Sequence, residues 1–83
     1  MKQTVRSNPK PKDRKTLLQK MFGNLIRARR TYLGLTQEEL AEKADMHFTY
    51  VSSTERGERN ISLANIEKLA DALECSMKDL MPK

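Results

Sequence analysis

The sequence has a single cysteine, Cys75, among its 83 residues. One thiol cannot build an internal disulfide framework, so we expect a reducing compartment, and the cytoplasm is the predicted location. No apolar run approaches the roughly 18 residues that a membrane span needs. The charged N-terminus also lacks the apolar segment of a secretory signal. We therefore expect one small domain at most, with no membrane partner.

Residue types that enzymes and metal sites require are equally scarce. His47 is the only histidine, and the sequence has no phosphate-binding glycine motif, no H-E-x-x-H and no paired-cysteine spacing. We therefore predict no enzymatic activity, no metal and no cofactor. A lone histidine next to a phenylalanine is more often a helix cap or a phosphate contact than a catalytic base.

Most of the chain also lacks a net charge. Residues 1–15 carry six basic side chains and one acidic one, whereas residues 16–83 carry ten of each. Two prolines and very few apolar residues predict that residues 1–15 form a disordered basic arm. Such an arm is a common companion of nucleic-acid binding, although it could serve only as a solvated tail.

Helical periodicity is what the remaining residues do contain. From Leu18 to Leu33, apolar residues recur at steps of three and four, which predicts a first helix from about residue 16. Thr36 and Glu39 have the spacing of a capping box and predict a short helix over about 37–44. Another short helix is expected over about 47–56, ending at Gly57.

Two further capping patterns, at Ser62 and at Ser76 with Asp79, predict two more helices. No stretch shows sustained alternation with a period of two. The predicted fold is therefore all-α, with five helices in one domain over residues 16–83.

The two short central helices, joined by a short turn, predict a helix-turn-helix. Ala41 fits the point where the helices cross, because only a small side chain lets the backbones approach there. The second helix presents an outward face of hydroxyl groups, one aromatic ring and one cation, formed by Phe48, Thr49, Ser52, Ser53 and Arg56. Slim hydroxyl side chains suit the major groove, about 12 Å wide, and an aromatic ring suits the methyl group of thymine. This face predicts binding to double-stranded DNA, although Phe48 could instead fold back onto the core.

The segment TQEELAEKADMHFTYVSSTERGERNISLANIEKLADAL resembles the DNA-binding domain of the phage Cro/repressor family of helix-turn-helix proteins. Within it, FTYVSSTERGERN and SLANIEKLADAL are most similar to the controller proteins of restriction–modification systems. The resemblance covers about residues 20–81. It implies a small homodimer that regulates its own operon and the endonuclease gene.

The resemblance implies roles for individual residues. Thr49, Ser52 and Ser53 match positions that contact bases or backbone, and with Phe48 they form the predicted base-reading set. The residues expected to contact the DNA backbone are Gln37, His47, Arg56, Arg59 and Asn60. Arg30 and Glu55 match a pair that commonly forms a salt bridge between the first helix and the recognition helix.

The sequence departs from the family's pattern at three positions. Asp45 stands where the turn usually has glycine, and Thr54 stands where a large apolar residue is usual. Asp tolerates the left-handed conformation better than most residues, so the turn is expected to persist. Phe48 occupies a position that is often basic or polar, so the family's operator sequence cannot be transferred.

The C-terminal end is the predicted site of homodimerisation. An apolar strip there consists of Leu73, Met77, Leu80 and Met81, although plain core packing would explain the same pattern. Doubling a helix-turn-helix predicts a palindromic operator. Three other functions stay open: an antitoxin with a toxin partner, a phage-type repressor, and a protein-interaction module without DNA.

Overall fold

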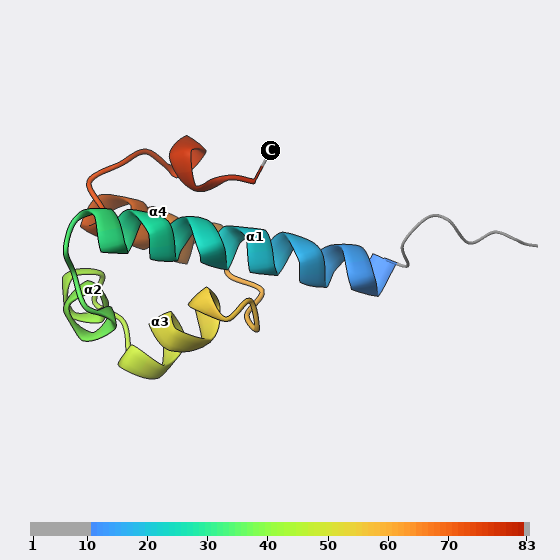
Figure 1. The fold of residues 1–83 in the computed structure, drawn as a ribbon, viewed down its shortest axis with the longest axis horizontal. Coiled ribbons are helices and arrows are strands. Elements are labelled where there is room, and N and C mark those ends of the chain that lie inside the picture. Colours follow the sequence, from blue (N-terminus) through green and yellow to red (C-terminus); the bar gives the residue numbers. More distant parts are fainter. Residues whose placement is uncertain (1–10, 83) are drawn as a thin grey trace, which may run out of the picture.

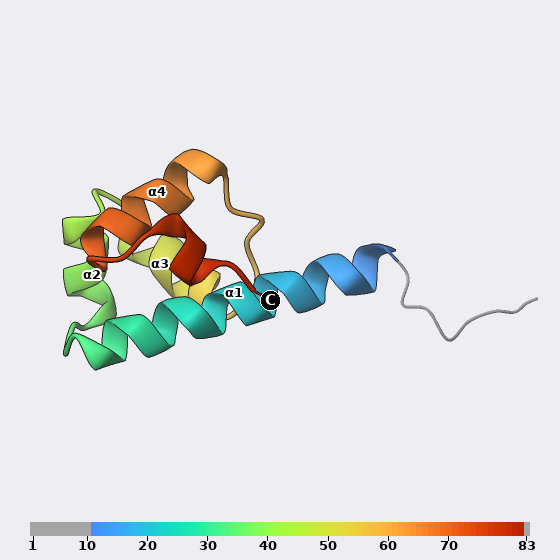
Figure 2. The ribbon, with the colours of Figure 1, turned by 90° about the horizontal axis from the view of Figure 1, so that it is seen from above.

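The computed structural model describes residues 11–82 of the chain. It has four α-helices and one short 3-10 helix: α1 (Pro11–Tyr32), α2 (Gln37–Lys43), α3 (Phe48–Glu55), α4 (Leu63–Ala72) and η1 (Met77–Leu80). No strand occurs within the described range, in agreement with the predicted all-α class. In Figure 1, α2 and α3 lie below α1 and η1 lies above it, while Figure 2 shows the N-terminal part of α1 extending beyond the other helices.

The fifth predicted helix is wrong as an α-helix, because η1 is a single 3-10 turn of four residues. The expected capping box is present at its start, where the Ser76 backbone N–H donates to Asp79 Oδ2 over 3.1 Å. The helix cannot continue, since Met81 adopts an extended conformation at φ −87° and ψ 130°. A residue that precedes a proline, here Pro82, is sterically disfavoured in the helical region.

The first helix begins at Pro11, five residues earlier than the sequence pattern predicts. Residues 11–15, which we expected in a disordered arm, are therefore helical. Proline is favourable as a first helical residue because its φ is already suitable and its missing N–H would have had no partner there. The rest of the predicted arm, residues 1–10, lies outside the described residues.

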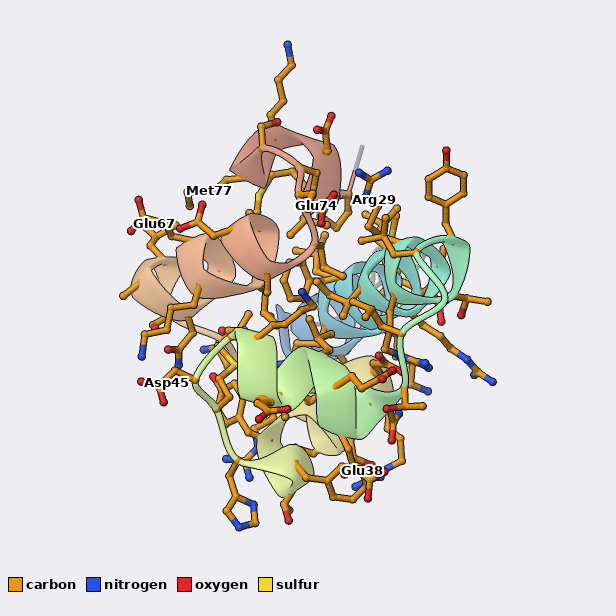
Figure 3. The ribbon with its side chains drawn as sticks, turned by 90° about the vertical axis from the view of Figure 1, so that its left-hand side faces the viewer. Arg29, Glu38, Asp45, Glu67, Glu74 and Met77 are labelled. Carbon is orange, nitrogen blue, oxygen red and sulfur yellow. The ribbon has the colours of Figure 1, made fainter. Side chains whose placement is uncertain are left out.

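The core lies where α1 meets α2, α3, α4 and η1. Its fully buried side chains come from all five elements and are Ile26, Leu40, Val51, Leu69, Leu73 and Leu80. Arg29 joins α1 to the end of α4, because its guanidinium donates to the backbone carbonyls of Leu73 at 2.9 Å and Glu74 at 3.0 Å. Figure 3 shows Arg29 beside Glu74 at this junction.

This core corrects part of the predicted dimer strip. Leu73 and Leu80 are 0% and 1% exposed, so both side chains are already packed inside one protomer. Met77 is half-buried against the core, and Met81 is 37% exposed. Periodic apolar spacing cannot distinguish a core position from an interface position, because both bury the same kind of side chain. Of the four residues, Met81 is the one with substantial exposed surface.

Candidate nucleic-acid interface

The turn between α2 and α3 has the form expected from the sequence. Asp45 adopts a left-handed conformation with φ 56°, and the Met46 backbone N–H donates to the Ala41 carbonyl over 2.8 Å. Ala41 is 3% exposed, so its small side chain lies inside the crossing of the two helices. Asp45 therefore takes the place of a turn glycine at a modest conformational cost.

His47 begins α3 as its N-cap. Its ring Nδ1 accepts a hydrogen bond of 3.1 Å from the Thr49 backbone N–H, while the imidazole as a whole is exposed. The histidine thus fills a structural position at the start of the helix, and the rest of its ring faces solvent.

One face of α3 is buried against α1, and its backbone approaches that helix closely at Gly23. A Cβ added to Gly23 would lie 2.7 Å from the Glu55 carbonyl oxygen and would also meet the Thr54 carbonyl oxygen. Real Cβ atoms do not come this close to backbone atoms, so only glycine fits. Gly23 therefore sets how closely the recognition helix sits on α1, a role that sequence reasoning missed.

Thr54 occupies the centre of this buried face. Its side chain is 1% exposed, and its Oγ1 has no hydrogen-bond partner within the part of the chain that the structure describes. Burying a hydroxyl without a partner costs free energy, because its hydrogen bond to water is lost without replacement. The departure noted in the sequence at this position is therefore a weak point in the packing of α3.

The opposite side of α3 carries the predicted base-reading residues, with one exception. Phe48 is 43% exposed, Thr49 is exposed and Ser52 is half-buried. Ser53 is only 5% exposed, and its hydroxyl donates to the Thr49 and Tyr50 carbonyls at 2.9 and 3.2 Å. Its burial and these bonds argue against direct base contact by Ser53.

Ser53 instead orients the loop that follows α3. Its hydroxyl oxygen accepts a 2.7 Å hydrogen bond from Arg59 Nε, and the Arg59 guanidinium lies 4.8 Å from the centre of the Tyr50 ring. The Tyr50 hydroxyl in turn accepts a hydrogen bond from Asn65 Nδ2 of α4 at 3.0 Å. Arg59 is thereby held against α3, while Asn60, the next residue, is exposed.

A buried ion pair joins α3 to α1. Arg30 Nε lies 2.6 Å from Glu55 Oε2, and Arg30 Nη2 donates to Glu55 Oε1 over 3.0 Å. The side chains are 14% and 3% exposed. Hydrogen bonding to the Glu55 carboxylate raises the pKa of the Arg30 guanidinium above its ordinary value. The charge pair is therefore fully formed and largely removed from water.

Gln37 also belongs to this buried cluster. Its side-chain Nε2 donates to Glu55 Oε1 over 2.9 Å, and Arg30 Nη1 donates to the Leu35 carbonyl over 2.8 Å. Glu55 thus connects α1, α2 and α3 through one carboxylate. The amide of Gln37 retains a second N–H, so a phosphate contact stays a prediction for this half-buried residue.

A second, exposed ion pair lies just after the last residue of α3, where Arg56 is the C-cap. Arg56 Nε and Nη2 donate to the two carboxylate oxygens of Glu58 at 3.0 and 3.2 Å, and Arg56 Nη1 donates to Ser52 Oγ at 2.6 Å. The side chains of Arg56 and Glu58 are 54% and 57% exposed. The sequence analysis selects Arg56 but not its acidic partner Glu58, although Glu58 lies only two positions further along the chain.

Among residues 11–82, no group of three or more potential metal ligands comes together, and no helix is long and apolar enough to cross a membrane. The polar surface of α3 and its loop is thus the main candidate site in this range. It combines an exposed aromatic ring and the hydroxyl groups of α3 with two arginines that follow this helix, and the helix is held by a buried ion pair.

Comparison with known proteins agrees with this geometry. Residues 26–80, more than half of the chain, match the helix-turn-helix family. The control protein C.BamHI of Bacillus amyloliquefaciens is 47% identical over 62 residues, which are 74% of this chain and 76% of that protein. This chain belongs to the helix-turn-helix family of transcriptional regulators.

Solved structures of this family have the same fold. The restriction–modification controller protein C.AhdI from Aeromonas hydrophila is 44% identical, with a TM-score of 0.75 over 76% of this chain and 96% of that chain. The hypothetical transcription factor NHTF from Neisseria is 36% identical, with a TM-score of 0.76 over 98% of this chain and 90% of that chain. This helix-turn-helix regulator is therefore homologous to restriction–modification controller proteins, a family of DNA-binding regulators and not of enzymes.

Proposed function

We propose that the chain is a sequence-specific DNA-binding regulator that acts as a homodimer on a palindromic operator in the cytoplasm and controls a restriction–modification operon. The observation that carries this proposal is the exposed polar face of α3, held in place by the buried pair of Arg30 and Glu55. The similarity to C.BamHI and C.AhdI supports a controller protein over an antitoxin.

The proposed base contacts are Phe48, Thr49 and Ser52, which lie on the accessible side of α3. A partly exposed aromatic ring makes apolar contact with the methyl group of thymine, and hydroxyl groups donate to or accept from base edges. Ser53 is left out of this set because its hydroxyl already holds Arg59. Its proposed role is to position that arginine beside the DNA.

The proposed backbone contacts surround α3. They would fix the register of the protein on DNA without reading its sequence, and they are Gln37, His47, Arg56, Arg59 and Asn60. Residues 1–10 add Lys2, Arg6 and Lys10 and contain no acid. We propose that these cations also bind phosphates, which would make the salt dependence of binding steeper.

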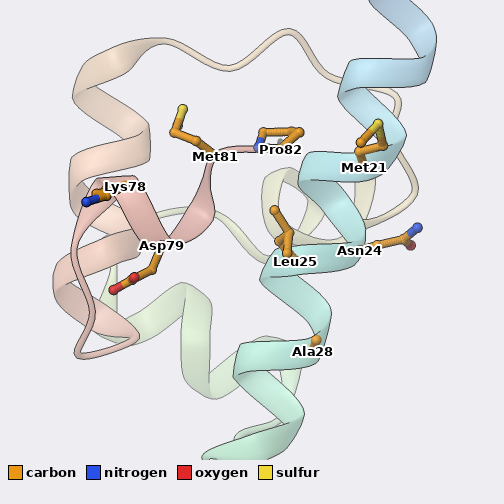
Figure 4. A pocket seen from close by; sticks show the side chains of 8 residues that line it. All are labelled: Met21, Asn24, Leu25, Ala28, Lys78, Asp79, Met81 and Pro82. Carbon is orange, nitrogen blue, oxygen red and sulfur yellow. The ribbon is translucent and has the colours of Figure 1, made fainter.

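The proposed dimer interface is an apolar groove of about 650 Å³ between α1 and the C-terminal segment. Figure 4 shows Met21, Leu25 and Ala28 on α1 and Met81 and Pro82 on the segment after η1. We propose a second copy of this chain as the occupant, because a single helix-turn-helix contacts too few base pairs to select one operator. A two-fold interface is self-complementary, so the groove of one copy would face the same groove of the other copy.

Sedimentation tests the dimer. Met81→Asp should shift the chain toward monomer at micromolar concentration, because it places a charge in the apolar interface. Phe48→Asp is the matched control, since Phe48 is similarly exposed but lies on α3. A variant at Leu80 is unsuitable because that side chain is in the core. Equal sedimentation of the Met81→Asp variant and the unmutated dimer would contradict this interface.

Footprinting on the DNA upstream of the chain's own gene tests the proposed function. We expect protection of two half-sites related by a palindrome, with centres about one helical turn, or roughly 34 Å, apart. DNA of unrelated sequence provides the control. Uniform weak protection of both DNAs would contradict sequence-specific binding, and protection of one unrepeated half-site would contradict the dimer.

A further inference from the structure

The ion pair between Arg56 and Glu58 lies within the proposed DNA-binding surface, and both of its side chains are more than half exposed. The Glu58 carboxylate accepts from both Nε and Nη2 of Arg56, so it occupies one whole edge of the guanidinium. Ser52 Oγ accepts from Nη1. An arginine has five N–H donors, and these three bonds leave two of them for another acceptor.

Acidic side chains outnumber basic ones in the helix-turn-helix and the loop that follows it. Residues 36–60 contain three basic side chains, which are Lys43, Arg56 and Arg59, against six acidic ones. Arg59 forms no ion pair with an acid among the described residues, whereas Arg56 does. Hydrogen bonding to Arg56, with a smaller contribution from the charge of Arg59, lowers the pKa of the Glu58 carboxyl. The carboxylate of Glu58 therefore acts on both arginines that follow α3.

We propose that Glu58 is a specificity-determining residue, because its carboxylate withholds Arg56 from phosphates and so reduces the affinity for DNA of unrelated sequence. This inference rests on the proposed function. Binding to unrelated DNA is almost entirely electrostatic, so each available cation strengthens it. An acid that neutralises a cation at the surface weakens this binding against every sequence.

The operator complex depends less on the free charge of Arg56. There, contacts from α3 to the base edges add to the phosphate contacts. The bonds to Ser52 and Glu58 also hold the guanidinium in one orientation, so less side-chain freedom is lost when its two remaining N–H groups find an acceptor. Removing the Glu58 carboxylate should therefore raise the affinity for unrelated DNA more than the affinity for the operator.

Glu58→Gln tests the proposal in titrations of the full chain with operator DNA and with unrelated DNA at several salt concentrations. On unrelated DNA we expect the salt slope to steepen by about 0.9 for each protomer, which changes affinity about 3.5-fold between 50 and 200 mM salt for each added contact. Operator affinity should rise less, so the ratio of the two affinities should fall.

Two further variants show whether the effect passes through Arg56. Glu67→Gln removes one exposed negative charge on α4, outside the proposed DNA-binding surface, and is the matched control; Glu67 is labelled in Figure 3. It should change neither slope nor ratio. In an Arg56→Gln background, Glu58→Gln should have a much smaller effect on the slope, because the cation that it releases is absent and only its weaker influence on Arg59 is left.

Several results would overturn the inference. An equal gain on both DNAs would mean that Glu58 sets overall affinity and not specificity. Weaker operator binding with unchanged binding to unrelated DNA would make Glu58 part of base reading. An unchanged slope, or an undiminished effect without Arg56, would also contradict it. If the unmutated chain prefers no sequence, the proposed function and this inference both fail, whereas a preference that Glu58→Gln leaves intact refutes the inference alone.

Discussion

Two neighbouring residues at the C-terminal end of α3, Glu55 and Arg56, form ion pairs of the same chemistry in opposite environments. Glu55 and Arg30 are 3% and 14% exposed and share further hydrogen bonds with Gln37 and Leu35. Arg56 and Glu58 are both more than half exposed, and among residues 11–82 their further side-chain bond is the one from Arg56 to Ser52. Removing one partner of a buried pair strands the other charge away from water, whereas exposed partners return to water at little cost. One pair therefore holds the recognition helix, and the other lies in contact with solvent, where the proposed DNA contacts would form.

Neutralising each acid in turn tests most strongly whether burial makes the two ion pairs differ in their contribution to stability. Glu55→Gln should lower the free energy of unfolding by about 3 kcal/mol, the lower end for a buried pair, because Arg30 keeps some exposure. Glu58→Gln makes the same chemical change at the exposed pair and should leave the melting temperature nearly unchanged. Thermal and denaturant unfolding measure both. Equal effects of the two variants would show that burial does not separate the pairs.

Gly23→Ala tests whether the buried pair depends on the close approach of α1 and α3. The added methyl group would meet the Thr54 and Glu55 carbonyls, so α3 must move outward. We expect a loss of about 2 kcal/mol by denaturant unfolding, even though alanine favours a helix over glycine by about 1 kcal/mol. Arg27→Ala, at an exposed position on α1 outside the proposed dimer groove, is the control and should cost little. A more stable Gly23→Ala variant would mean that α1 and α3 have room to separate.

Thr54→Val should have the smallest effect and the opposite sign. It replaces the buried hydroxyl that lacks a partner with a methyl group of similar shape. We expect a gain of about 1 kcal/mol in the free energy of unfolding, because no hydrogen bond within the described residues is lost. The same change at the exposed Thr49 should leave stability nearly unchanged. Destabilisation by Thr54→Val would indicate that the hydroxyl has a partner, such as a water molecule.

Local signals in the sequence predicted much of the fold. The capping box of Thr36 and Glu39 is present, with hydrogen bonds of 2.8 and 3.0 Å, and Asp45 makes the turn. These features depend on residues a few positions apart, which a pattern can recognise. The sequence pattern does not predict the start of α1 at Pro11, because proline and a high density of charge are also typical of disordered segments.

The candidate site was less predictable, because several of its side chains form hydrogen bonds with residues of other elements. Ser53 looked like an outward hydroxyl, yet it is bound to Arg59, six residues later. Gln37 donates to Glu55 across 18 positions of sequence. Leu80 fitted an interface as well as a core, because burial inside one chain and burial between two chains select the same residue types. Such partners emerge only when the packing of all the helices is known.

Base reading by the exposed face of α3 is the central claim, and Phe48→Ala tests it most directly. The measurement is the affinity of this variant for operator DNA and for unrelated DNA at one salt concentration, beside the unmutated chain. Loss of a good base contact should weaken operator binding by about 1–3 kcal/mol while binding to unrelated DNA barely changes. Equal weakening on both DNAs would contradict the claim and would show that Phe48 does not read sequence.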